Sequence, residues 1–219
     1  MTNQHRTPLA PTLLAKPLTG AVLRLVDILV AASMLLVGAL PMILIAALIW
    51  REDKDSIFFR QTRVGQGGKT FEILKFRTMF TDPDRFTGAQ AAEDGSKKAR
   101  ADFQTTTAND PRITRVGKFL RASHLDELPQ VLNVLQGHMS LVGVRPDVPV
   151  QESDYTKQVW IDRHVLRPGI TGMAQVAPDV DSTATRTRYD LEWVQTHSVS
   201  LYIKIILKTV VKVLRRNSF

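Results

Sequence analysis

Apolar residues dominate one continuous stretch near the start of the chain, residues 21 to 50. No charged residue occurs from Ile28 to Trp50. At about 1.5 Å per residue, a helix of this length crosses a hydrocarbon core of roughly 30 Å. The pattern therefore predicts a membrane helix over residues 21 to 50. An N-terminal arm of residues 1 to 20 precedes it, and a cytosolic domain of residues 51 to 219 follows.

Pro41 lies inside this stretch, and both of its flanks are basic. A proline in a helix interior removes a backbone hydrogen bond and kinks the helix. The positive-inside rule keeps basic flanks in the cytoplasm, and the flanks here carry Lys16 and Arg24 before the stretch and Arg51, Lys54, Arg60 and Arg63 after it. We therefore expect a re-entrant helix that breaks at Pro41 and returns to the same face. The alternative is a single bitopic span that tolerates its proline, as membrane helices commonly do.

After the apolar stretch, the pattern predicts a β-hairpin and then mostly helical structure, an α/β fold that is mostly α. Two β-rich runs, residues 56–65 and 70–79, surround a Gly-Gly turn. Residues 81–109 are polar and predict a mobile loop or a short surface helix. Further on we expect a helical core at 115–136, a turn-rich loop at 137–145, a possible helix at 150–165, a loop at 167–172 and mostly helical structure at 190–219.

The C-terminal stretch combines an apolar helix with a basic stripe. Basic residues recur there at helical spacing, at Lys204, Lys208, Lys212 and Arg215. This pattern is typical of an amphipathic helix that lies in the membrane interface with its lysine stems snorkelling. The alternative is an ordinary core helix with one solvated face.

Composition narrows the classes of partner. The chain has 219 residues, a net charge of +8 and no cysteine. A basic balance suits anionic lipid, polyphosphate substrates or nucleic acid. Because no nucleic-acid motif and no aromatic–basic alternation occur, we expect the first two and no nucleic acid. The lack of cysteine excludes disulfides and thiolate metal sites, which fits a cytoplasmic location.

Two adjacent carboxylates, Asp126 and Glu127, form the strongest candidate for chemistry. Pro129 favours a helix start just before it, because proline is tolerated in a first turn. A helix N-terminus stabilises anions, so it would hold a carboxylate ionised and would also welcome a phosphate. The alternative is ordinary capping, since Ser123-x-x-Asp126 resembles a capping box.

Basic residues are concentrated around this acidic pair. An anionic nucleophile can approach a diphosphate only if the local charge is neutralised, which arginine forks and a bound Mg²⁺ achieve. Each basic residue taken alone would be interpreted as a solvated surface charge. The concentration around the acidic pair is the unusual feature, and it comprises Arg112, Arg115, Lys118, Arg121 and Arg145.

From about Arg24 to about Val213, the chain resembles the monotopic phosphoglycosyl transferases, also called bacterial sugar transferases. The ordered set of matches is specific, although no single match would be. The matching stretches are Phe58-Phe-Arg-Gln-x-Arg-Val-Gly65, Lys75-Phe-Arg-Thr-Met79, Asn109-Asp-x-Arg-Ile-Thr-x-Val-Gly117, Leu125-Asp-Glu-Leu-Pro-Gln130, Asn133-Val-Leu-x-Gly137, Met139-Ser-Leu-Val-Gly143 with Arg145-Pro146, and Pro168-Gly-Ile-Thr-Gly172.

The resemblance implies a re-entrant helix broken at Pro41 over a small cytosolic domain with interfacial helices. It implies transfer of a phospho-sugar from a nucleotide sugar, usually a UDP-sugar, to undecaprenyl or another polyprenyl phosphate, in the synthesis of exopolysaccharide, capsule or O-antigen. Asp126 matches the family nucleophile and Glu127 its partner, and both would hold Mg²⁺. Substrate phosphates would be bound by Lys75, Arg77, Arg121 and Arg145, with Asp190 as a weaker match.

The resemblance also implies an inner-membrane location with the active site on the cytoplasmic face, membrane lipid as a partner, and a possible homodimer. Two departures from the family pattern occur. Leu40 replaces the usual serine before the proline, which bears on the sharpness of the bend. Val144 replaces the usual proline before Arg145, which predicts a less rigid loop.

Two rival functions stay open from the sequence. In the first, the lipid phosphate attacks directly in a ternary complex, and the two carboxylates only hold Mg²⁺. In the second, the chain is a membrane-anchored basic scaffold without catalysis, which has no need of the acidic pair.

Overall fold

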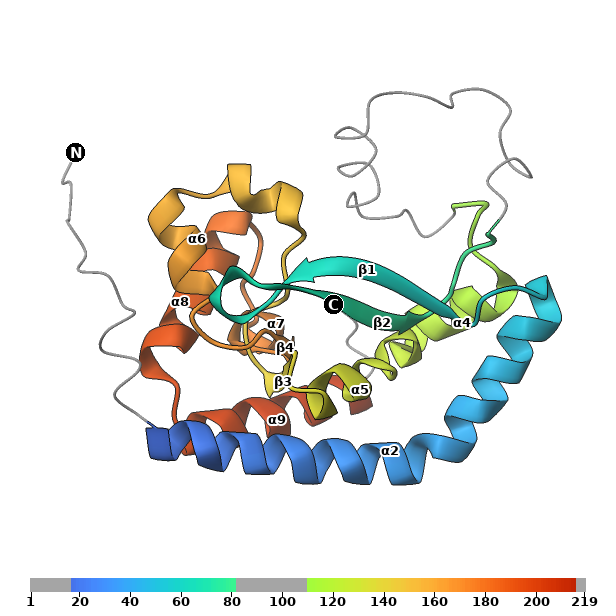
Figure 1. The fold of residues 1–219 in the computed structure, drawn as a ribbon, viewed down its shortest axis with the longest axis horizontal. Helices are drawn as coiled ribbons and strands as arrows, with labels where there is room; N and C mark the ends of the chain where they lie inside the picture. Colours follow the sequence, from blue (N-terminus) through green and yellow to red (C-terminus); the bar gives the residue numbers. More distant parts are fainter. Residues whose placement is uncertain (1–16, 82–109, 216–219) are drawn as a thin grey trace.

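The computed structural model describes residues 17–81 and 110–215, which form a mostly helical structure with two small sheets (Figure 1). Residues 1–16 of the predicted arm 1–20 and residues 82–109 of the predicted polar segment 81–109 lie outside the described residues.

The apolar stretch forms one long helix, α2, over Pro17–Asp53, with Pro41 inside it. Among the described residues it is the one helix long and apolar enough to cross a membrane, and only 11% of its most apolar window is buried. Leu36 and Val37 are 82% and 79% exposed, so the protein itself does not cover them. Figure 1 shows that the helix changes direction between its two halves, as expected of a helix with an internal proline.

Both ends of α2 are bonded to the same domain. In the first half, Asp27 is 2% exposed and accepts hydrogen bonds from Ser140 Oγ and from the Leu141 amide, at 2.9 and 2.8 Å. At the other end, Glu52 accepts hydrogen bonds from the amides of Arg115 and Val116, at 2.7 and 3.1 Å. The helix is therefore anchored to the domain on both sides of Pro41.

The predicted hairpin is confirmed. Strands β1, Phe58–Val64, and β2, Thr70–Phe76, pair antiparallel, with Phe59 opposite Lys75. The turn between them contains the 3-10 turn η1, Gln66–Gly68. Gly67 and Gly68 have φ angles of 68° and 78°, a region that favours glycine.

The helical core predicted for 115–136 consists of separate pieces, because the chain leaves the helix at His124. Helix α4, Arg115–Ser123, begins with Thr114 as its cap and ends at His124, which has a left-handed φ of 56°. A 3-10 turn, η3, covers Leu125–Glu127, and helix α5, Gln130–Leu135, follows Pro129. The break places the acidic pair in a turn between two helices.

Two loops predicted from the sequence contain short strands. Strand β3, Ser140–Val142, pairs in parallel with β4, Gly169–Thr171. The backbones approach closely at this point: a Cβ atom on Gly169 would lie 2.0 Å from the Gly143 nitrogen. Only glycine fits such an approach, so these glycines serve packing.

The C-terminal part is helical, as predicted, but in separate pieces. The region 150–165 forms the 3-10 helix η4, Pro149–Asp154, and helix α6, Lys157–Arg163. A short helix α7, Met173–Val176, follows β4. The last stretch forms α8, Thr183–Thr196, and α9, Val199–Leu214, separated at His197.

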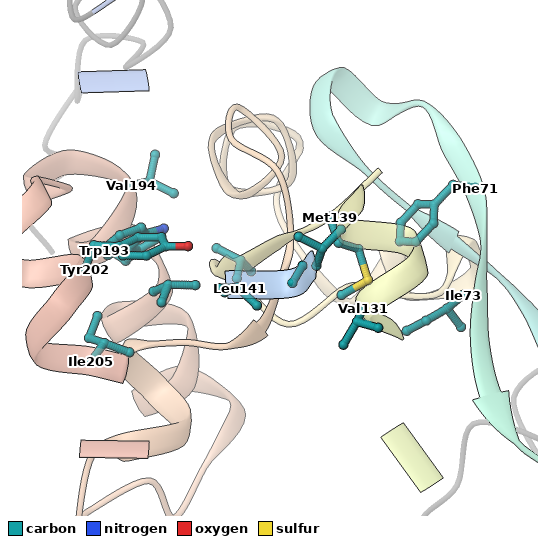
Figure 2. Packing of buried hydrophobic residues seen from close by; sticks show 13 residues of the cluster. Phe71, Ile73, Val131, Met139, Leu141, Trp193, Val194, Tyr202 and Ile205 are labelled. Atoms are coloured by element: carbon teal, nitrogen blue, oxygen red, sulfur yellow. The ribbon is translucent and has the colours of Figure 1, made fainter. Parts of the chain in front are cut away.

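The main core joins the hairpin to the C-terminal helices. Figure 2 shows the cluster extending from Phe71 and Ile73 of β2 to Trp193 and Tyr202 of the last two helices. A second cluster packs the end of α2, through Ile45 and Ile49, against Phe76 and Leu120. Each half of α2 thus contacts its own core cluster.

Helix α9 exposes apolar side chains beside lysines. Ile203, Leu207 and Leu214 are 39%, 61% and 76% exposed. Lys204 and Lys208 are exposed as well, whereas Lys212 is half-buried and donates a hydrogen bond to the Gln175 carbonyl at 2.8 Å. Lys212 therefore does not share the solvent exposure of the other two lysines.

Candidate active site

The acidic pair lies against the hairpin. Lys75 of β2 donates a hydrogen bond to Glu127 Oε1 at 2.6 Å, forming an ion pair that is about four-fifths buried. The side chain of Asn133 holds helix α5 against strand β2. Its amide oxygen accepts a hydrogen bond from the Leu74 N–H at 2.9 Å, and its amide nitrogen donates one to the Glu72 carbonyl at 2.8 Å. The Asn133 side chain thus bonds backbone groups at the edge of β2 that a neighbouring strand would otherwise bond.

Asp126 is mostly buried beside two cations. Burial raises the pKa of its carboxyl above the usual range, and the charge of Glu127 adds to the rise. Lys75 and Arg121 oppose it. Desolvation therefore makes the anionic form of Asp126 less favourable than it would be in water.

Glu127 differs from its neighbour in the direction of its pKa shift. Burial raises the pKa of Glu127, but Lys75 and Arg145 together outweigh this and hold it below the usual range. Two adjacent carboxyls with opposite pKa shifts are suited to different roles.

A small cavity that opens to solvent lies next to Glu127. Its polar lining consists of Arg63, Lys75, Glu127, Gln130 and Arg145. Arg145 is exposed, and within the described residues no hydrogen bond or ion pair engages it. Its fork is therefore available for an anion.

Arg121 approaches the acidic pair from α4. Its Nε donates to Thr78 Oγ1 at 2.9 Å. Burial lowers the pKa of Arg121, and the charges of Asp126 and Asp110 counter that effect. The structure thus brings Asp126, Glu127, Lys75, Arg121 and Arg145 of the predicted site into one region.

Two other predicted site residues lie elsewhere. Arg77 is 6% exposed and forms an ion pair with Asp53, at 2.6 Å, beside the end of α2. Asp190 is 1% exposed and bonded to Arg163. Neither residue lines the cavity beside Glu127, and each is paired with a charged partner elsewhere.

Arg163 links Asp190 to the loop that carries Arg145. Its side chain is fully buried and donates to both oxygens of Asp147, two residues after Arg145. The Asp147 carbonyl also accepts from the Val64 amide at 2.9 Å. Val144 is 4% exposed in the main core. The loop is therefore held by packing and by buried charge, although it lacks the family's proline.

Sequence reasoning did not assign Arg63 or Asn133 to the site. Arg63 donates to the Pro146 carbonyl at 3.0 Å and lines the cavity. The available signal was the matched stretch Phe58–Gly65, which contains Arg63, and the stretch that begins at Asn133. Both residues form hydrogen bonds with residues that are far away in sequence, so no local pattern indicates these contacts.

The acidic pair fits a magnesium ion. Mg²⁺ prefers oxygen ligands and is usually bound through one or two carboxylates together with substrate phosphates. Within residues 17–81 and 110–215, no group of three or more His, Cys, Asp or Glu residues could hold a metal alone. The two carboxylates of the acidic pair are the kind of ligand that Mg²⁺ shares with a substrate phosphate.

The sequence is similar to known proteins of one family. Residues 18–216 match the model of a family described as bacterial sugar transferase. The chain is 41% identical over 196 residues to a UDP-glucose:undecaprenyl-phosphate glucose-1-phosphate transferase of Caulobacter vibrioides, covering 85% of this chain and 67% of that protein. It is 40% identical over 194 residues to a protein of the same name from Xanthomonas campestris pv. campestris.

The relatives differ in length. The match covers 84% of this chain but only 37% of the Xanthomonas protein. Exopolysaccharide production protein ExoY of Sinorhizobium fredii is 37% identical over 210 residues, with 93% of this chain and 91% of that protein covered. The chain therefore corresponds to part of some relatives and to nearly all of another.

Proposed function

Because the chain belongs to the bacterial sugar transferase family, we propose that it transfers a phospho-sugar from a nucleotide diphosphate sugar to a polyprenyl phosphate. The names of two relatives specify UDP-glucose and undecaprenyl phosphate, and another relative is an exopolysaccharide production protein. We infer a UDP-sugar donor, an undecaprenyl-type acceptor and a role in surface glycan synthesis.

The observation that carries this proposal is the turn Leu125–Glu127 among cations from three other elements. Lys75 is within 2.6 Å of Glu127, and Arg145 lines the same cavity. A diphosphate brings two or more negative charges to a carboxylate nucleophile. The surrounding cations offset this repulsion, and their fixed positions suit charge that shifts during phosphoryl transfer.

In the first half-reaction, Asp126 is the nucleophile. A carboxylate oxygen of Asp126 forms a bond to the sugar-linked phosphorus, and the bond from that phosphorus to the bridging oxygen breaks. The nucleoside monophosphate leaves with the bonding electrons. Aspartyl phosphates are precedented as covalent intermediates in other enzymes. Arg145 is positioned to bind the charge that develops on the phosphates.

In the second half-reaction, an oxygen of the lipid phosphate attacks the same phosphorus. The bond to Asp126 breaks, which regenerates the carboxylate and yields a polyprenyl diphosphate sugar. Glu127 and Asp126 would hold Mg²⁺, which when bound supplies charge neutralisation for the phosphates. Glu127 would exchange its contact with Lys75 for this role, leaving Lys75 free to bind phosphate.

The proposal includes a re-entrant placement of α2 in the inner membrane, with the site on the cytoplasmic face. Its support is the attachment of both ends of the helix to one domain, through Asp27 and through Glu52. A straight span would carry one end away from that domain. Exposed apolar residues of α9, such as Leu207, would lie against the same membrane surface.

The test is release of UMP from a panel of UDP-sugars by the purified chain with polyprenyl phosphate and Mg²⁺. We expect release with at least one donor and none with Asp126→Asn. Ping-pong kinetics are expected for the covalent route, whereas a ternary complex gives intersecting patterns. Failure with every donor, by a folded protein, would favour the scaffold alternative.

A further inference from the structure

We propose that Arg63 is a second phosphate-binding residue of this site and engages the same anionic group as Arg145. The inference rests on the proposed function and adds a residue to the binding of its diphosphate substrate. It assigns a role to an arginine of strand β1 that lines the cavity.

Arg63 is held in place from two sides. Its side chain is partly buried and lines the cavity together with Lys75, Glu127 and Arg145. One terminal nitrogen donates to the Pro146 carbonyl at 3.0 Å, and the other donates to the side chain of Gln61. The guanidinium is therefore fixed directly beside the residue that follows Arg145.

The charges around the cavity do not balance. Three cations line it, and the single carboxylate, Glu127, is already paired with Lys75. Within the described residues Arg63 has no ion-pair partner, and Arg145 has none either. Burial lowers the pKa of Arg63 to about 10, and the charge of Arg145 adds to that effect, whereas the charges of Asp147 and Glu127 oppose it. Two guanidinium groups held close together are suited to bind an anion between them.

A donor on Arg63 is also unsatisfied. Its Nε is buried and has no hydrogen-bond acceptor in the protein. A buried donor without a partner is destabilising, so structures rarely keep one without a reason. A phosphate entering the cavity would supply a negative charge beside this incompletely bonded guanidinium.

A purely structural role for Arg63 is the rival explanation. In that case the bond to Pro146 would hold the loop, and Arg63 would act only by placing Arg145. The two explanations differ once Arg145 is absent: a positioning residue then has nothing left to position, whereas a binding residue still contacts the anion.

The experiment measures the dissociation constant for UDP by calorimetry, with the purified full chain in detergent and Mg²⁺. We expect Arg63→Gln to weaken binding by about 10- to 100-fold, the scale of one charge-assisted hydrogen bond. Arg60→Gln is the matched control, because Arg60 lies on the same strand and is fully exposed. It should change binding by less than about twofold.

The decisive comparison uses the Arg145→Gln background. There, adding Arg63→Gln should weaken UDP binding by a further factor of about ten or more. No further loss would overturn the proposal and leave Arg63 as a positioning residue. If Arg63→Gln does not fold, Arg63→Lys keeps the charge without the planar fork. Weaker UDP binding by that variant supports the proposal, and wild-type affinity overturns it.

The outcomes also separate this inference from the proposed function. If the wild-type chain neither binds UDP nor releases UMP, the proposed function fails. If the wild type is active and Arg63→Gln binds UDP normally, only the role of Arg63 fails.

Discussion

At the level of single residues, Lys75 and Arg145 near the acidic turn differ in whether the protein itself bonds them. Lys75 is already bonded to Glu127, at 2.6 Å, whereas Arg145 is exposed and makes no hydrogen bond or ion pair within the described residues. Lys75 therefore helps to hold the pKa of Glu127 below its usual range. In the proposed function, Arg145 would contribute mainly by binding a substrate phosphate.

We predict that Arg145→Ala lowers the rate far more than Lys208→Ala. Loss of one contact that strengthens in the transition state costs about 2.7–4 kcal/mol, on the order of 10²–10³ in rate. Lys208 is exposed on α9 and should contribute about 1 kcal/mol or less of attraction to anionic lipid. Lys208 suits this comparison better than Lys212, which is bonded to Gln175.

The measurement is the rate of UMP release in vesicles that contain anionic lipid, at low and high salt. The Lys208→Ala defect should fade as salt screens the membrane surface, while the Arg145→Ala defect persists. Equal defects that disappear together at high salt would mean that Arg145 is only a surface charge.

The sequence predicts the acidic pair and three of its basic neighbours because their residue types suit the chemistry. It does not separate Arg145 from Arg77, although one is exposed and the other is buried against Asp53. Nor does it show that Asp190 faces Arg163. Those differences depend on partners 24 and 27 residues away, which no local pattern specifies.

On the level of secondary-structure elements, the loop from Val144 to Asp147 is fixed from several directions. Arg63 bonds its Pro146 carbonyl, Arg163 bonds the Asp147 carboxylate, and Val144 is packed in the core. The buried charges Asp147, Arg163 and Asp190 connect this loop to helices α6 and α8. The stability of this cluster should therefore influence the placement of Arg145.

We predict that the stability cost of Asp190→Asn shrinks as pH rises from about 4 to about 6. Burial raises the pKa of Asp190 to about 6, against the opposing charge of Arg163. The native state thus keeps a proton that the unfolded chain has lost, and the stability this provides disappears as pH rises through 6. Asp190→Asn has no such loss, so the difference in free energy of unfolding between the wild type and this variant should narrow by up to about 3 kcal/mol.

The free energies of unfolding of the wild type and Asp190→Asn, measured at pH 4.5 and pH 7, test this prediction, since the two proteins share all other titrating groups. A stability cost of the substitution that grows with pH would contradict the prediction. That result would show that the ion pair to Arg163 outweighs burial and holds the pKa of Asp190 below its usual range.

The elements themselves were predicted unevenly, for local reasons. The hairpin has β-rich runs on both sides of a Gly-Gly turn, so its pattern is complete within about 20 residues. The helix ends at His124 without a glycine or proline at that position that would have predicted its end. Strands β3 and β4 have three residues each, too few for an alternating pattern. Their pairing depends on the close approach of Gly143 to Gly169.

For the molecule as a whole, the important feature is a long apolar helix whose two halves pack on one domain. Ala31 belongs to the main core cluster, and Ile45 and Ile49 belong to the second. Between them Leu36, Val37 and Leu40 are left uncovered. In the proposed function, this arrangement would let a membrane-buried acceptor and a water-soluble donor meet at one site.

We predict that both ends of α2 face the cytoplasm. The native chain has no cysteine, so Leu18→Cys and Lys54→Cys each introduce a single label site at an exposed position. An impermeant thiol reagent added to intact cells should label neither variant, and permeabilised cells should show both labelled. Labelling of Leu18→Cys alone from outside would establish a bitopic span.

The central claim is that Asp126 carries the phospho-sugar between two substrates. Its most direct test is the intact mass of the purified chain after incubation with the active UDP-sugar and Mg²⁺, without lipid acceptor. We predict a gain of one phospho-sugar, located on the peptide containing Asp126, absent from Asp126→Asn and lost when polyprenyl phosphate is added. Full transfer activity without any such adduct, or an adduct that persists in Asp126→Asn, would contradict the account.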